Sequence, residues 1–179
     1  FPPDKPLEVQ PAPGGIRRLT SAQIKNSVSD LLGPAAAATL ALPVDQQLHG
    51  FSSIAAAENA VTSIDVSTFE STFTTAVDTA IMDLSTVEAI APCIQNPDDA
   101  CYDQVARQVG RAAWRRTVTD DEVAVLVGIA AQGKAWGAGS FDDGLKYELL
   151  TILQSPNFLY IVEVGDKDAT SGYRKLSQF

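Results

Sequence analysis

Apolar residues recur every three or four positions along most of this chain, the spacing that places them on one face of an α-helix. The pattern predicts helices over residues 20–32, 67–84, 119–133 and 140–154, and a further helix that begins just after residue 98 or 99 and continues past residue 113. The alanine run 35–38 predicts a short helix. The fold class that follows is mainly α, a helical bundle.

Three of these helices have the same start signal. Thr20 with Gln23, Ser67 with Glu70 and Thr119 with Glu122 each place a hydroxyl three residues before a side chain that can bond back to the backbone. Aspartate pairs near the other starts are expected to complement the positive helix amino ends rather than to act as acids or bases. The sequence therefore identifies no catalytic residue.

The hydrophobic period changes near the carboxyl end of the sequence. Residues 158–164 are rich in aromatic and β-branched side chains, and residues 173–176 could return antiparallel to them. This pattern predicts a small β-hairpin, with continued helix as the alternative.

Composition divides the chain into four parts. Residues 1–15 are rich in proline and glycine and are expected to form an extended arm. Residues 16–92 are expected to form an amino-terminal helical module, residues 93–156 a disulfide-stapled helical module, and residues 157–179 the hairpin and the start of a further module. Ser177 is typical of a helix amino cap with no helix behind it, so we expect the chain to be one portion of a longer polypeptide.

The charge of the chain is unevenly distributed. The net charge is −9, and residues 26–106 contain eleven acidic residues and no lysine or arginine. Such a stretch cannot neutralise phosphates, which argues against nucleic acid as a partner. No apolar run approaches the roughly 20 residues of a membrane-spanning helix. The acidic stretch is interpreted as a solvated surface or, alternatively, as a docking face for a basic partner protein.

Cys93 and Cys101 are the only cysteines, and a Pro-Asp-Asp loop lies between them. An even pair around so short a loop favours a disulfide that would stabilise the fold by roughly 2–3 kcal/mol and would indicate an oxidising compartment. Two buried free thiols are the alternative. With a single histidine, no His–Cys metal site can be assembled from this sequence.

Four residues are candidates for contact with a cofactor or partner. Trp114, Arg115 and Arg116 place two guanidiniums beside an indole, which suits the clamping of a carboxylate such as a haem propionate or a partner's acidic edge. The alternative is that the arginines pair with acidic residues of this chain. His49, in a loop, could ligate a haem iron or shuttle protons, or could be an ordinary surface residue.

Several strings, in a fixed order from about residue 16 to residue 179, resemble one family of exported bacterial proteins, the planctomycete-type, cytochrome-c-associated domains of unknown function. The strings are Arg17-Arg18-Leu19-Thr20 with residues 26–33; Pro43-Val44-Asp45 with Gly50-Phe51; Cys93 and Cys101; residues 110–116 with Thr119 and Glu122; and residues 153–160 with Glu163, Gly165 and Leu176-Ser177.

The resemblance implies an exported protein, periplasmic, outer-membrane-attached or extracellular, with a lipid anchor allowed ahead of Phe1. It implies that the chain is the amino-terminal helical scaffold of a c-type haem oxidoreductase or electron-transfer protein. The haem would be carried by the rest of the polypeptide or by a second chain that completes the fold. A redox partner protein is also expected. No motif of this chain binds a cofactor itself. The alternative is a non-redox binding or assembly module of a cell-surface or periplasmic complex.

Overall fold

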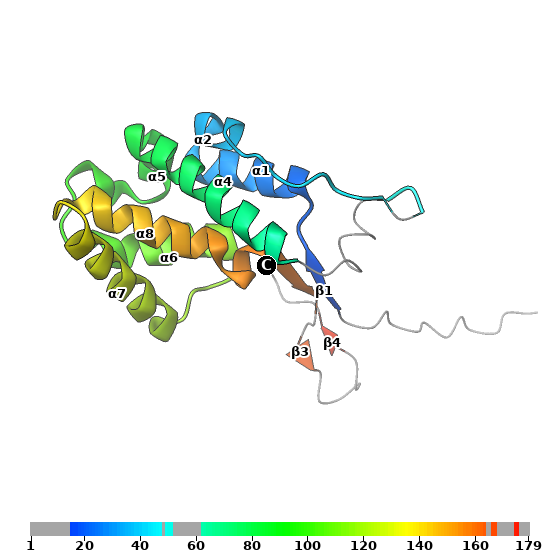
Figure 1. Cartoon of the computed structure of the whole chain (residues 1–179). Helices are drawn as coiled ribbons and strands as arrows, with labels where there is room; N and C mark the ends of the chain where they lie inside the picture. Colours follow the sequence, from blue (N-terminus) through cyan, green and yellow to red (C-terminus); the bar gives the residue numbers. More distant parts are fainter. Residues whose placement is uncertain (1–14, 48, 52–61, 164–165, 168–173, 176–179) are drawn as a thin grey trace, which may run out of the picture.

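The computed structural model describes residues 15–47, 49–51, 62–163, 166–167 and 174–175, and these form a mainly helical body with small antiparallel sheets (Figure 1). The predicted fold class is confirmed. The arm was predicted over residues 1–15, of which residues 1–14 lie outside the described residues and Gly15 begins β1. The predicted helix entrance at residues 176–179 also lies outside the described residues. The elements in chain order are β1 (Gly15–Arg18), α1 (Ser21–Leu32), α2 (Pro34–Ala38), α4 (Ser63–Met82), α5 (Ser85–Ile90), η1 (Pro92–Gln95), α6 (Cys101–Trp114), α7 (Asp120–Trp136), α8 (Phe141–Gln154), α9 (Pro156–Leu159), β2 (Tyr160–Glu163), β3 (Asp166–Lys167) and β4 (Arg174–Lys175).

The helix start signals were correct at two of the three predicted positions. Thr20 with Gln23 and Thr119 with Glu122 form reciprocal capping boxes at the starts of α1 and α7. The third prediction was wrong, because α4 begins four residues before Ser67, at a capping box of Thr62 with Asp65. Ser67 lies inside the helix, where its hydroxyl donates to the Ile64 carbonyl oxygen at 3.0 Å.

The predicted disulfide is confirmed. Cys93 in η1 is bonded to Cys101, the first residue of α6, with Cα atoms 5.5 Å apart. The predicted aspartate cap of α6 is absent, since its cap residue Ala100 makes no side-chain cap bond. Asp98 instead accepts from the Ala100 amide within the loop. The covalent bond thus fixes the α6 amino end where a polar cap was expected.

The strand near the carboxyl end has a different partner from the one predicted. β2 pairs antiparallel with β1, with Gly15 opposite Glu163 and Arg18 opposite Tyr160. The hairpin itself is formed by β3 and β4, with Asp166 opposite Lys175. Pairing β2 with β1 brings the two ends of the helical body to one edge (Figure 1).

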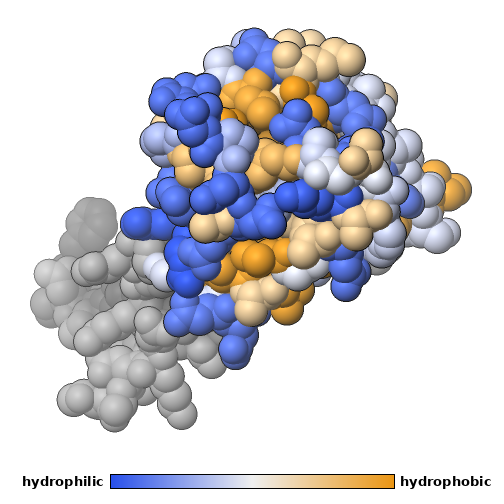
Figure 2. Space-filling model, turned by 90° about the vertical axis from the view of Figure 1, so that its left-hand side faces the viewer, coloured by the Kyte–Doolittle hydropathy of each residue, from blue (hydrophilic) through white to orange (hydrophobic). Residues whose placement is uncertain are grey.

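The core lies where α4, α6 and α7 pack around α8. The ring of Phe73 on α4 meets the edge of Phe158 on α9, and Tyr102 on α6 stacks on Phe141 at the start of α8. Thr72 on α4 is buried, and its hydroxyl oxygen accepts a hydrogen bond from the Ala41 amide at 2.7 Å. On the face shown in Figure 2, apolar side chains reach the surface in separate areas between hydrophilic bands. None of the described helices has the length and hydropathy needed to cross a bilayer.

Candidate functional site

The α6–α7 corner, residues 114–122, contains three of the four candidate residues, Trp114, Arg115 and Arg116. Arg115, the residue that ends α6, has φ 55° and ψ 31°, the left-handed conformation usually taken by glycine at helix ends. This conformation turns the chain sharply from α6 towards α7, and it directs three consecutive side chains to different surroundings.

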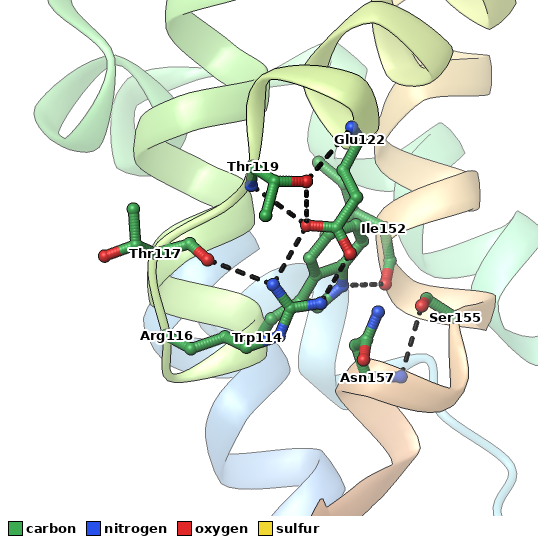
Figure 3. Close-up of polar contacts among 8 residues, drawn as sticks. All are labelled: Trp114, Arg116, Thr117, Thr119, Glu122, Ile152, Ser155 and Asn157. Atoms are coloured by element: carbon green, nitrogen blue, oxygen red, sulfur yellow. Dashed lines mark hydrogen bonds and ion pairs between the residues drawn. The ribbon is translucent and has the colours of Figure 1, made fainter. Parts of the chain in front are cut away.

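Trp114 is a structural anchor of the corner. Its side chain is buried, and its indole N–H donates to the carbonyl oxygen of Ile152 at 3.0 Å (Figure 3). Ile152 lies in the last turn of α8, where carbonyls have no intrahelical partner. The indole therefore closes the carboxyl end of α8 against α6.

Arg115 holds α9, the helix after α8, by hydrogen bonds to backbone carbonyls. Its Nη2 donates to the carbonyl oxygens of Asn157 at 3.3 Å, Phe158 at 2.8 Å and Tyr160 at 3.3 Å. These three carbonyls lie in α9 and at the start of β2. Burial lowers the pKa of the guanidinium, and no carboxylate accepts from it among the residues that the structure describes.

Arg116 pairs with an acid of its own chain, as the alternative interpretation of the two arginines supposes. Its two Nη atoms bond the two Glu122 carboxylate oxygens at 2.9 and 2.6 Å, and its head lies 5.2 Å from the Trp114 ring centroid (Figure 3). Glu122 also closes the capping box with Thr119. Chiefly because of the Arg116 hydrogen bonds, the pKa of Glu122 falls to about 2. The pair is thus charged on both sides across the physiological range.

Two concave areas flank this ion pair. The α7–α8 groove, a cavity of about 520 Å³, has a predominantly apolar lining. It is lined by Trp114, Asp121, Glu122, Val125, Leu126, Thr151, Gln154, Ser155 and Asn157. On the other side, the arginine pocket of about 350 Å³ is lined by Gln108, Arg111, Ala112, Arg115 and Arg116.

His49 does not join the corner. It is exposed, with φ 52°, in the loop after α2, and Figure 1 places that loop at the opposite end of the molecule from α7. The four sequence-predicted residues therefore form one cluster of three and one separate surface histidine. Among the described residues no group of three or more His, Cys, Asp or Glu could hold a metal ion.

The string Pro43-Val44-Asp45 has a structural role that its sequence did not reveal. Asp45 Oδ2 accepts from the Ser21 amide at 2.7 Å, and the Ser21 hydroxyl donates to the Pro43 carbonyl oxygen at 2.6 Å. Arg18 also reaches the Asp45 carboxylate at 3.4 Å. The loop therefore holds the amino end of α1, whose first amides have no intrahelical partner.

Glu148 is the titratable residue that sequence reasoning missed. It lies on α8 with no exposed surface, and neither carboxyl oxygen has a hydrogen-bond partner among the described residues. Burial, and secondarily the charge of Asp103, raises its pKa to about 9. The signal was present in the sequence, because position 148 shares the helix face of Leu145, Leu149 and Ile152, which is buried.

These observations define a helical, disulfide-linked protein whose motif residues hold helix ends together. Residues 17–82 match the family model PSD3, described as a protein of unknown function (DUF1587). Residues 101–163 match PSD5, described as a protein of unknown function (DUF1595). The chain therefore contains two regions similar to domains of unknown function. No curated protein and no solved structure matches the chain.

Proposed function

We propose that this chain is the helical scaffold portion of an exported c-type haem oxidoreductase or electron-transfer protein, with the haem carried by another part of the polypeptide or by a partner chain. The single observation behind the scaffold role is the use of the motif side chains. Trp114 and Arg115 bond carbonyls of other helices, Arg116 pairs with Glu122, and Asp45 bonds an α1 amide. Side chains committed in this way fix geometry instead of reacting.

Two further features support the proposal. The disulfide between Cys93 and Cys101 suits an exported protein, because such bonds persist in oxidising compartments. The pairing of β1 with β2 brings both ends of the helical body to one edge, an arrangement suited to a module joined to further polypeptide. The haem assignment rests on the resemblance of the sequence strings.

The test is to purify the native protein with its polypeptide and partners intact and to look for covalent haem. We expect a haem-stained band and a Soret absorbance in the assembly, and neither in the 179-residue chain expressed alone with the same maturation machinery. An assembly purified without haem would overturn the redox part of the proposal.

A second candidate is a non-redox binding module of a cell-surface or periplasmic complex. The α7–α8 groove favours it, because its lining is predominantly apolar and includes Val125, which is 60% exposed. Asn157 and Gln154 also offer side-chain amides with no partner among the described residues. A haem-free assembly that still requires this chain would favour the second candidate over the first.

A further inference from the structure

The arginine pocket is a basic concavity in an acidic chain, with three arginines among its lining residues. Arg111 lies on α6, Arg115 lies one turn later at its end, and Arg116 follows. Of the three guanidiniums, Arg116 alone has a carboxylate partner within the described part, the Glu122 side chain. The pocket therefore holds about two positive charges that no acid compensates, in a chain of net charge −9.

The donors that remain free are arranged for an external ligand. Arg111 is exposed, and neither an ion pair nor a hydrogen bond engages its head within the described ranges. Arg115 makes its described hydrogen bonds through Nη2, and none of them uses its Nε or Nη1. Gln108 adds an amide at the rim. Guanidinium groups have only donors, so the complementary group is an oxyanion.

Within that class, carboxylates suit the pocket better than polyphosphates or nucleic acid. The forked donors of arginine match a carboxylate in a bidentate arrangement, as Arg116 already shows with Glu122. A highly charged polyanion would meet strong repulsion from the remaining acidic chain, whereas one or two carboxylates would meet less.

We propose that the arginine pocket binds a ligand with one or two carboxylates, with Arg111 as its principal contact and Arg115 as the second. The ligand is either a small dicarboxylate or a pair of acidic side chains of another protein. The proposal does not depend on haem, and its test uses the chain without haem.

Arg111 allows a clean test, because its removal breaks no contact that the structure describes. Arg115 and Arg116 do not, since replacing either also releases helix ends or Glu122. The matched control is Arg107→Gln, one turn earlier on the same helix. The guanidinium of Arg107 is already bonded to Asp103 and Asp120. Both variants remove one positive charge from the exposed surface of α6.

The experiment titrates the ¹⁵N-labelled chain at low ionic strength and follows the arginine Nε–H resonances. The probes are a capped peptide with two adjacent glutamates, its two-glutamine counterpart, the dicarboxylate succinate and inorganic phosphate. We expect saturable shifts at Arg111 and Arg115 with the glutamate peptide or succinate and none with the glutamine peptide. Arg111→Gln should weaken binding at least tenfold and Arg107→Gln less than twofold.

Comparison of the probes also distinguishes the two sources of the carboxylates, a small dicarboxylate and the acidic side chains of another protein. Tighter binding of the glutamate peptide than of succinate would identify acidic side chains of a partner, and tighter succinate binding would identify a small dicarboxylate. Three outcomes would overturn the proposal. They are no saturable shifts with either carboxylate probe, an equal loss of affinity in Arg111→Gln and Arg107→Gln, or tighter binding of phosphate than of either carboxylate probe.

Discussion

The two regions that match family models fix their helices by opposite kinds of hydrogen bond. In residues 17–82 side-chain oxygens accept from backbone amides: Thr20 and Thr62 at helix starts, Asp45 on Ser21 and Thr72 on Ala41. Residues 101–163 have such caps too, but their long-range hydrogen bonds to the backbone come from side-chain donors. The Tyr102 hydroxyl donates to the Phe141 carbonyl oxygen at 2.9 Å. Trp114 and Arg115 donate to carbonyls 38 to 45 residues further along the chain.

The charge distribution contributes to this difference. Residues 26–106 contain eleven acidic residues and no lysine or arginine, which favours carboxylate acceptors there, such as Asp45 on the first amide of α1. The arginines after residue 106 add charged donors, of which Arg115 bonds carbonyls of α9 and β2. The uncharged Trp114 indole donates in the same region.

The largest expected effect lies in the second region. Trp114→Ala removes a buried indole and leaves the Ile152 carbonyl unpaired, so we expect a loss of about 3–5 kcal/mol in the free energy of unfolding. Denaturant unfolding measures it. The control is Trp136→Ala at a side chain that is 67% exposed, where we expect less than about 1 kcal/mol. Equal losses in the two variants would mean that Trp114 does not anchor α8.

The next effect concerns Glu148 and depends on pH. A carboxyl whose pKa is raised to about 9 when folded keeps its proton while the unfolded chain, with a value near 4.5, releases it. Stability should therefore fall as pH rises through this window, at most by roughly 1.4 kcal/mol per pH unit. Between pH 5 and 8 we expect the wild type to lose roughly 3 kcal/mol relative to Glu148→Gln in denaturant unfolding.

The matched control for Glu148 lies in the first region. Glu70→Gln removes one carboxylate from the exposed surface of α4. Its unfolding curve should follow the wild type from pH 5 to pH 8. Parallel behaviour of Glu148→Gln and the wild type over this range would show that the buried carboxyl has found a partner or water.

What the sequence could predict follows the same division between local and distant contacts. The start of α1, the start of α7 and the disulfide depend on residues three to eight positions apart, and all were predicted correctly. The Trp114 and Arg115 contacts were not, because which carbonyl a long side chain reaches depends on how α6, α8 and α9 pack. The partner of β2 was missed for the same reason, since β1 precedes it by more than 140 residues.

The smallest effect tests the first region. Thr20→Ala removes one reciprocal cap of α1, in which the hydroxyl accepts from the Gln23 amide at 3.3 Å. We expect a loss of about 1 kcal/mol in denaturant unfolding, because water can satisfy a released amide at a helix start. Thr20→Ser, which keeps the hydroxyl, should recover most of that loss. If Thr20→Ala cost as much as Trp114→Ala, local caps and distant donors would hold the fold equally, and the contrast between the two regions would not stand.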